Sequence, residues 1–275
     1  QPGIVVLTHA PGHYGEIAAA RELNIPVLEL QHGIIGKNDP EYQWPGEYTQ
    51  VKADIPLPNI MALFGSLYEE LLLSNGFWES KDMAVVGCGA LDRYREEKRP
   101  GTPPQDRPIK LLFMSQISTQ ALSIPFLKEF LFTCVQDSTF QARLDIKVHP
   151  SEQPSRKSYE ELAADFPGHC RILPEESYPL DVICDADVVL SYNSLSIAEA
   201  VALGVPAISL RGESVPGGFA GSFQLKGIEE IVPHVETPTE LIDALENMFG
   251  DAEGLTALQN RLKEYGRVLY QKGFL

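Results

Sequence analysis

The sequence has few cysteines and no hydrophobic run long enough to cross a membrane. Its four cysteines (Cys88, Cys134, Cys170 and Cys184) are scattered without a C-x-x-C pair, so we expect buried thiols in a reducing compartment. No apolar stretch approaches the ~20 residues of a membrane span. We therefore expect a cytoplasmic protein without a transmembrane segment, with peripheral attachment at the inner face of the membrane as the alternative.

The chain is also poor in positive charge. It has 22 lysines and arginines against 38 aspartates and glutamates, a net charge of −16 at pH 7. This balance argues against a nucleic-acid partner and against a basic patch that docks on an anionic membrane. A local group of backbone N–H groups can still bind a small anion in an acidic protein.

Two common nucleotide-binding motifs are missing, and so is a convincing spacing of metal ligands. There is no G-x-G-x-x-G and no Gly-Lys-Ser/Thr P-loop, which argues against dinucleotide oxidoreductases and P-loop ATPases. Asp185-Ala-Asp187 has the form of an Asp-x-Asp metal motif, but it falls between a helix end and a strand start, away from the expected ligand edge. We therefore predict no metal site and no cofactor.

The chain does contain a regular alternation of apolar, strand-like runs and amphipathic segments. A charged, proline-rich stretch at residues 98–108 separates two such series. The alternation predicts an α/β protein with two facing, Rossmann-like doubly wound domains, at residues 1–97 and 109–275. The first series has about four strands where such domains commonly have five or six. We therefore expect the N-terminal domain to be incomplete, with more of the chain upstream of Gln1.

The stretch 187–210 is the most informative part of the sequence. It predicts a strand, a polar turn, a helix that ends at Gly204 and a second strand. Ser196 and Glu199 have the spacing of a capping box. The turn would lie at the carboxyl end of a parallel strand and over a helix N-terminus, where open α/β sheets bind anionic ligands. We predict the phosphate end of a nucleotide site there, with hydrogen bonds from Ser191, Asn193, Ser194 and Ser196 and with Glu199 on the ribose.

Polar residues follow four other predicted strands. His32 stands directly after the strand at 25–30, flanked by Gln31 and Gly33, and His9 and His13 lie in the neighbouring strand-end loop. Ser115 and Gln116 follow the strand at 110–114. Lys147, His149 and Pro150 end the strand at 144–148, where a cation and an imidazole suit a phosphate or a ribose. The alternatives are structural: His32 bonded to its own loop, His149 capping the next element, and Ser196 with Glu199 as an ordinary cap.

Taken in order, these motifs resemble those of the two-domain GT-B nucleotide-sugar glycosyltransferases. The order is Gln31-His32-Gly33, His149-Pro150, then Ser191, Ser194, Glu199-Ala200 and Gly204-Val-Pro206. The resemblance is greatest to the bacterial surface-polysaccharide branch, which includes capsule Kdo transferases, polysialyltransferases and CDP-glycerol glycerophosphotransferases. The chain lacks the Asp/Glu-Asp-Gly stretch that supplies the base in some sialyltransferases, so catalytic residues upstream of Gln1 stay an open alternative.

The resemblance implies transfer of a sugar, or of a glycerophosphoryl group, from an activated nucleotide to a glycan or lipid-linked acceptor without a bound metal. The donor, with cytidine as the suggested base, would bind the second domain and the acceptor the first, and transfer would occur across the cleft. His32 and His149 are the catalytic candidates, His32 on the acceptor side and His149 on the donor phosphate or ribose. The candidates for substrate and donor binding are Gln31, Gly33, His13, Ser115, Gln116, Lys147, Pro150, Ser191, Asn193, Ser194, Ser196 and Glu199.

Two other functions stay open at this point. The first is an isomerase that resembles the non-hydrolysing UDP-N-acetylglucosamine 2-epimerases, although the acidic and basic catalytic residues of those enzymes near the hinge have no counterpart that we can identify. The second is a non-catalytic module that binds sugar nucleotides or glycans. Residues 217–221, which are rich in glycine, read as a flexible loop that could close on a ligand.

Overall fold

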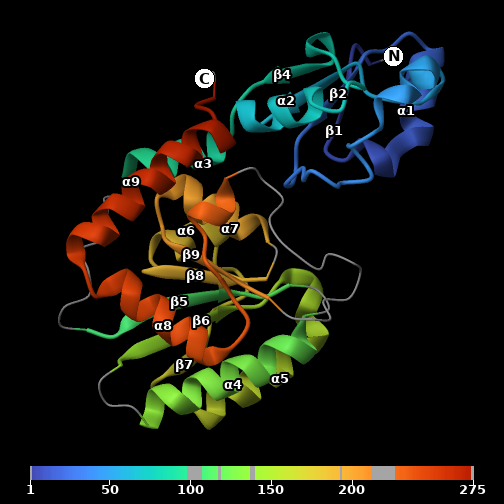
Figure 1. The fold of residues 1–275 in the computed structure, drawn as a ribbon. Coiled ribbons are helices and arrows are strands. Elements are labelled where there is room, and N and C mark those ends of the chain that lie inside the picture. The colour runs from blue at the N-terminus through green and yellow to red at the C-terminus, as the bar shows by residue number, and fades with distance from the viewer. Residues whose placement is uncertain are drawn as a thin grey trace. The chain divides into compact units, whose positions relative to one another are not determined.

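A computed structural model describes residues 2–97, 107–116, 119–136, 140–192, 194–211 and 227–273. The chain divides into two compact units: unit 1 comprises residues 1–93 and 267–275, and unit 2 comprises residues 94–266. Each unit is built on a parallel β-sheet with helices, which confirms the predicted α/β class (Figure 1). The glycine-rich segment 217–221 and most of the predicted linker lie outside the described residues.

Unit 1 contains a four-stranded parallel sheet in the order β1-β2-β3-β4. Its strands match the four apolar runs of the first series. An apolar cluster of Ala10, Ile17, Ala20, Ile25 and Val27 joins α1 to the sheet. The elements are β1 (Val5–Leu7), η1 (Ala10–His13), α1 (Tyr14–Glu22), β2 (Val27–Leu30), η2 (Gly46–Asp54), β3 (Ile60–Leu63), α2 (Ser66–Leu73), η3 (Ser80–Asp82), β4 (Met83–Val85) and the start of α3 (Gly89–Glu97), where η marks a 3-10 helix. The part of α3 from Tyr94 onward belongs to unit 2.

The last described residues pack in unit 1, whereas the sequence placed them in the second domain. The backbone N–H of Gln271 donates to the carbonyl of Phe64 at 2.8 Å. A side chain at Gly65 would clash with the carbonyl oxygens of Val268 and Leu269, so glycine is required for this close approach. The difference arises because α9 (Ala252–Leu269) begins in unit 2 and ends in unit 1, which a helical pattern alone does not reveal.

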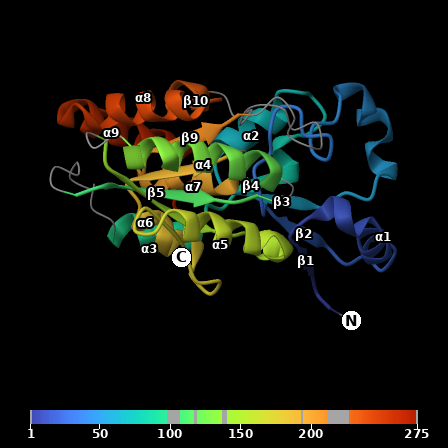
Figure 2. The same ribbon diagram turned by 90° about the horizontal axis from the view of Figure 1, so that it is seen from below.

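Unit 2 contains a six-stranded parallel sheet in the order β10-β9-β8-β5-β6-β7, counted over the described residues. Helices flank both faces of this sheet (Figure 2). Helices α4, α5 and α8 pack against the strands in one large apolar cluster. The elements are β5 (Ile109–Met114), α4 (Gln120–Gln136), β6 (Ala142–Lys147), η4 (Pro150–Ser155), α5 (Arg156–Asp165), β7 (Cys170–Ile172), α6 (Pro179–Cys184), β8 (Val188–Ser191), α7 (Leu195–Leu203), β9 (Ala207–Leu210), η5 (Ile228–Glu230), β10 (His234–Val235), α8 (Pro238–Phe249) and α9.

The segment from β8 to β9 folds as strand, turn, helix and strand, as predicted, but its cap differs. The Oγ atom of Ser194 accepts a hydrogen bond from the N–H of Ser196 at 3.2 Å, so Ser194 is the N-cap of α7. The predicted capping box of Ser196 and Glu199 is wrong because Ser196 already lies in the first turn of the helix. Gly204 ends α7 in the left-handed conformation at φ 72°, as glycine commonly does after a helix.

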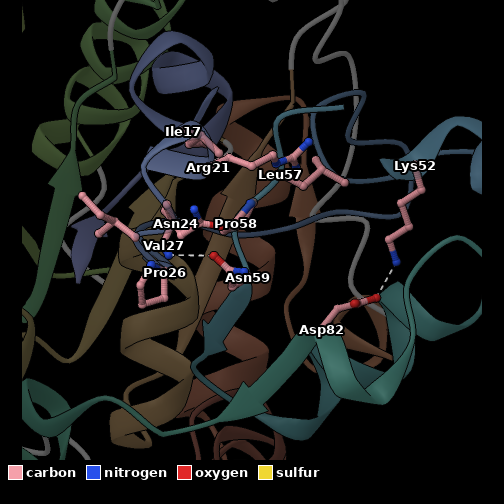
Figure 3. Close-up of a pocket in the computed structure, with 11 residues that line it drawn as sticks. Ile17, Arg21, Asn24, Pro26, Val27, Lys52, Leu57, Pro58, Asn59 and Asp82 are labelled. Atoms are coloured by element: carbon pink, nitrogen blue, oxygen red, sulfur yellow. Dashed lines mark hydrogen bonds and ion pairs between the residues drawn. The ribbon is translucent and has the colours of Figure 1, made fainter. Parts of the chain in front are cut away.

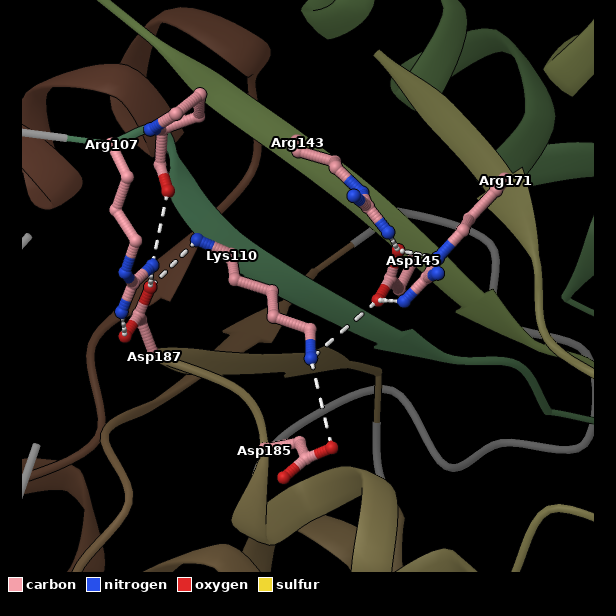
Figure 4. Close-up of polar contacts among 8 residues, drawn as sticks. Arg107, Lys110, Arg143, Asp145, Arg171, Asp185 and Asp187 are labelled. Carbon is pink, nitrogen blue, oxygen red and sulfur yellow. Dashed lines mark hydrogen bonds and ion pairs between the residues drawn. The ribbon is translucent and has the colours of Figure 1, made fainter. Parts of the chain in front are cut away.

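Charged side chains form a network on strands β5, β6 and β7 (Figure 4). Asp145 is 1% exposed and accepts two hydrogen bonds from Arg171, at 2.6 and 2.7 Å. Arg143 approaches the same carboxylate at 3.4 Å. At the amino end of β8, Asp187 binds Arg107 at 2.6 and 2.8 Å. The second aspartate of the Asp-x-Asp segment therefore has a structural partner.

None of the described helices is long and apolar enough to span a membrane. No disulfide joins the cysteines, and Cys134 and Cys170 are buried. Burial raises the pKa of Cys170 to about 12, which keeps this thiol protonated and unreactive at neutral pH.

Candidate functional site

Unit 2 contains a cavity of about 520 Å³ at the carboxyl ends of its central strands. The cavity is lined by residues that follow β5 and β6, by the loop between β7 and α6, and by the first turns of α7. Seven of the predicted donor-site residues come together in its wall: Ser115, Lys147, His149, Pro150, Ser194, Ser196 and Glu199. Residues as far apart as 115 and 199 in the sequence thus share one site.

The strand order explains why the cavity lies there. From β5 the sheet grows through β6 to β7 on one side and through β8 to β9 and β10 on the other. Loops that leave β5 and β8 therefore diverge to opposite sides, and the carboxyl ends of these strands leave a crevice. In open α/β sheets ligands bind at such a switch point.

The ring of His149 is held in a defined tautomer. Its Nδ1 atom accepts a hydrogen bond from the backbone N–H of Ser151 at 3.1 Å. A backbone N–H can only donate, so Nδ1 is the acceptor and the proton of the neutral ring is on Nε2. His149 can therefore offer an Nε2–H donor to a ligand in the cavity.

Lys147 brings a buried cation to the same cavity. Lys147 is only 5% exposed, and its Nζ atom donates a hydrogen bond to the carbonyl of Glu175 at 2.7 Å. Burial lowers the pKa of Lys147 from its ordinary value, since an ammonium group loses hydration there. An anionic ligand would replace that hydration and favour the charged form.

The N-terminus of α7 faces the same site. Ser194 and Ser196 line the cavity. Within the first turn, the N–H of Ser196 donates to Ser194 Oγ at 3.2 Å and the N–H of Ile197 donates to the Ser194 carbonyl at 3.0 Å, so the turn is held in place. The dipole of the helix favours an anion at this end. The cavity therefore offers three kinds of donor to a phosphate: an ammonium group, an imidazole N–H and a helix N-terminus.

Glu199 adds one carboxyl group to the wall, one helical turn from the cap. Burial raises the pKa of Glu199 to about 7, so the group changes charge near neutral pH. A carboxyl group accepts hydrogen bonds from hydroxyl groups in either state, which fits the predicted contact with ribose hydroxyls.

Two other predicted donor-site residues lie outside the cavity wall. Ser191 is fully buried, and its hydroxyl donates to the carbonyl of Met114 at 2.7 Å. This hydrogen bond links β8 to β5. Because Ser191 is buried in this way, the prediction that it binds phosphate is wrong. Gln116 is half-buried and is not part of the cavity wall. Asn193 lies outside the described residues.

Two features in and beside the cavity wall were not predicted from the sequence. The first is Glu152, which is 4% exposed and accepts a short hydrogen bond from the hydroxyl of Ser115. The second is the loop at residues 175–179, which lines the cavity. The loop follows β7, so its place at the carboxyl edge of the sheet could have been inferred. Glu152 could not, because an acidic residue in a polar segment gives no sign of burial.

Unit 1 brings two of its histidines together. His9 follows β1, His32 follows β2, and their rings meet edge to face with centroids 4.9 Å apart. The Nε2 atom of His9 lies 2.8 Å from Glu41 Oε2. The residues that follow two neighbouring strands thus lie together, and Glu41 is an addition that the sequence did not indicate. An imidazole paired with a carboxylate is a group that can accept a proton.

The other predicted residues of this edge have different surroundings. Gln31 is buried, and its amide is occupied at both ends, by the carbonyl of Gly33 at 2.7 Å and by the N–H of Phe64 at 2.8 Å. This pairing assigns Gln31 a structural role in place of the predicted ligand contact. A side chain at Gly33 would meet no atom within 4 Å, so open space lies beside it. His13 contacts Glu16 at 3.3 Å in the first turn of α1.

A buried acid lies beneath this edge. Glu29 is 2% exposed and accepts hydrogen bonds from the N–H of Ala10 at 2.9 Å and from the hydroxyl of Tyr42 at 2.6 Å. Burial raises the pKa of Tyr42, so the phenol remains a donor. These contacts fix the loop that carries His9. A charged residue inside the apolar run of β2 was a visible signal in the sequence.

A second cavity, of about 480 Å³, opens in unit 1 at the amino ends of β2, β3 and β4 (Figure 3). Its cations are engaged in structural contacts. Arg21 donates to two backbone carbonyls of the segment 53–55, at 2.8 and 2.7 Å, and Lys52 binds Asp82. The cavity lies at the edge of the sheet opposite to the histidines, and we assign no ligand to it.

Within the part of the chain that the structure describes, no three His, Cys, Asp or Glu side chains come together as a metal site.

Comparison with known proteins gives structural neighbours but no sequence relative. No family model matches the chain, and no curated protein matches it. A glycosyltransferase from Rickettsia africae matches with a TM-score of 0.58 at 15% identity, over 97% of this chain and 72% of that one. UDP-GlcNAc 2-epimerase from Neisseria meningitidis, solved with UDP-GlcNAc, matches with a TM-score of 0.64 at 19% identity, over 98% of this chain and 74% of that one. Anabaena HepE in complex with UDP-glucose matches with a TM-score of 0.58 at 11% identity, over 97% of this chain and 74% of that one.

The chain has the GT-B fold. This confirms the fold that the motifs implied. The GT-B neighbours include both transferases and epimerases, and at these identities the comparison concerns the fold alone. The chemistry of this GT-B chain therefore has to be argued from its own side chains.

Proposed function

We propose that this protein is a glycosyltransferase that uses a nucleotide-activated donor bound in the cavity of unit 2. The observation that carries the proposal is the convergence of Lys147, His149 Nε2–H and the N-terminus of α7 on one cavity at the switch point of the sheet. Such a set of donors suits the diphosphate of a sugar nucleotide.

The same groups would act on the reaction itself. When the bond between the sugar and the nucleotide breaks, negative charge develops on the leaving phosphate. Donors already aimed at that position stabilise the charge in the transition state without reorganisation. His149 and Lys147 would supply that stabilisation, and Glu199 would orient the ribose. No metal is needed for these roles, in keeping with the metal-independent branch that the motifs resemble.

The acceptor side of the proposal concerns unit 1. His32, in contact with the His9–Glu41 pair, would take the proton from the hydroxyl group that attacks the donor. The acceptor would be a glycan or a lipid-linked saccharide of a surface or capsular polysaccharide, as in the branch that the motifs resemble. A cytidine nucleotide is the donor that this resemblance favours, and the neighbours solved with UDP-sugars make uridine the competing base.

The first experiment is a thermal-shift panel with CMP, CDP, UDP, GDP and ADP. A ligand at 100 times its Kd that binds only the native state adds about 2.7 kcal/mol of stability, or a shift of about 5–10 °C for a chain of this size. We expect a selective shift with CDP or UDP that is lost in His149→Ala. His169→Ala is the matched control, because His169 precedes β7 at the opposite edge of the sheet.

Incubation with CDP- and UDP-sugars then tests catalysis. Release of the free nucleotide, faster with a glycan acceptor present, supports a transferase. If a nucleotide binds in the parent and equally well in His149→Ala, the assigned role of His149 is wrong. A panel without any shift from a folded protein would favour the non-catalytic module.

A second candidate is an epimerase of the same fold. It is favoured by the TM-scores of the 2-epimerase neighbours, which reach 0.64. An epimerase would convert UDP-N-acetylglucosamine into its manno isomer in the absence of any acceptor, and NMR of the sugar anomeric protons would detect that product. A transferase would leave the configuration at carbon 2 unchanged.

A further inference from the structure

Glu152 is a buried carboxylic acid that follows His149 in the same turn. It is 4% exposed, Oε2 accepts a short hydrogen bond from Ser115, and Oε1 has no hydrogen-bond partner among the described residues. Burial raises the pKa of Glu152. A buried carboxyl oxygen without a partner destabilises a fold. The position of Glu152 therefore points to a role other than stability.

Ser115 links this acid to His149. While the Ser115 hydroxyl donates to Glu152, its oxygen accepts the backbone N–H of His149 at 2.8 Å. The backbone N–H of His149 can only donate, so a lone pair of the Ser115 oxygen faces it and the hydroxyl hydrogen is left for Oε2 of Glu152. The N–H of Glu152 also donates to the carbonyl of His149 at 2.8 Å.

The turn also fixes the tautomer of the His149 imidazole. With the backbone of His149 held on both sides, the N–H of Ser151 reaches Nδ1 of the ring at 3.1 Å. This contact places the ring proton on Nε2, in a residue that lines the cavity. The chain of contacts thus runs from a buried acid through a hydroxyl group to the free donor of the imidazole.

We propose that Glu152 is a positioning residue for His149. Through Ser115 it holds the turn at residues 149–152 in the arrangement that presents Nε2–H to an anionic phosphate. The inference rests on the proposed function, because the phosphate would belong to the nucleotide donor. It differs from that proposal in assigning a role to a residue outside the cavity wall.

The test compares Glu152→Met with the parent in two measurements. The first is ¹⁵N NMR of the His149 ring in the protein without ligand, which reports the tautomer. The second is calorimetric titration with UDP and with CDP. We expect a mixture of tautomers and about tenfold weaker nucleotide binding in Glu152→Met, with stability equal to or above that of the parent. Glu160→Gln, an exposed acid on α5, is the control.

Two further variants separate a positioning role from a general structural one. Glu152→Gln keeps an acceptor for Ser115 and is expected to restore most of the affinity. Ser115→Ala breaks the same link from the other side and is expected to reproduce the tautomer change, which also provides the test if Glu152→Met does not fold.

An unchanged tautomer in Glu152→Met and Ser115→Ala would overturn the proposal, even if affinity fell together with stability. A changed tautomer with weaker binding supports it. If the parent binds neither nucleotide but the tautomer changes in the variants, the positioning of His149 stands and the proposed nucleotide function fails.

Discussion

His9 Nε2 lies 2.8 Å from Glu41 Oε2, although 32 positions of the sequence separate the two residues. The His9 ring meets His32 at 4.9 Å between centroids. A carboxylate thus orients one imidazole, and that imidazole packs against a second one.

We expect Glu41→Gln to lower the rate of the proposed sugar transfer about tenfold or more, because the amide no longer offsets the positive charge that His32, packed against His9, gains when it takes the acceptor proton. Stability should change by less than about 1 kcal/mol, since the pair is exposed. The rate of nucleotide release with an acceptor present measures the first effect, and urea unfolding the second. Glu16→Gln, which removes the carboxylate from the His13 pair, is the control and should leave the rate unchanged. A full rate in Glu41→Gln would remove Glu41 from the mechanism.

The second prediction concerns Glu199 and pH. Burial raises its pKa from 4.5 to about 7, so the native state binds this proton more tightly than the unfolded chain does. Stability must then fall as the pH rises from about 4.5 to about 7 and stay level above that range, with a contribution of up to about 3 kcal/mol. Glu199→Gln removes this contribution.

We therefore expect Glu199→Gln to be more stable than the parent at pH 8 and equally stable near pH 4. Urea unfolding over a pH series measures the difference. Parallel curves for the two proteins would show that Glu199 titrates with an ordinary pKa in the native state.

The third prediction separates two serines of the same turn. Ser191 is fully buried and donates to Met114, whereas Ser194 caps α7 and lines the cavity. Ser191→Ala should lower stability by about 1–2 kcal/mol and leave nucleotide affinity unchanged. Ser194→Ala should cost about 1 kcal/mol of stability and also weaken nucleotide binding. Weaker binding in Ser191→Ala, with Ser194→Ala unaffected, would reverse the assignment.

The fourth prediction concerns the charged network of unit 2. Arg171 binds the buried Asp145 through two hydrogen bonds of 2.6 and 2.7 Å, and Arg143 lies at 3.4 Å from it. Arg171→Ala leaves a buried carboxylate with weaker partners and should cost about 2–3 kcal/mol. Arg143→Ala should cost less than about 1 kcal/mol. Chemical denaturation at neutral pH measures the stability that each variant loses. Equal losses in Arg171→Ala and Arg143→Ala would contradict the argument from their distances to Asp145.

The local pattern of apolar and polar residues was sufficient to predict β1 to β9 and most helices. The apolar runs that became β1 to β9 were visible because a parallel strand is covered on both faces and needs continuous apolar residues. Helix α3 was not predicted, since its buried Leu91 and Tyr94 stand among charged residues that resemble a linker. The cap of α7 was placed two residues late because Ser194 and Ser196 are both good caps, and only the backbone geometry distinguishes them.

The sequence by itself determined the fold class and the edge at which a ligand would bind, because both follow from periodicity and from the direction of parallel strands. It also identified Lys147, His149, Ser194 and Glu199, each next to a strand end or a helix start. Only the tertiary structure decided which polar groups are available to a ligand. Ser191 and Gln31 have the same chemistry as ligand-binding residues, but burial and hydrogen bonds occupy them. Glu41 and Glu152 gained their roles from contacts across 32 and 37 positions, which no local pattern encodes.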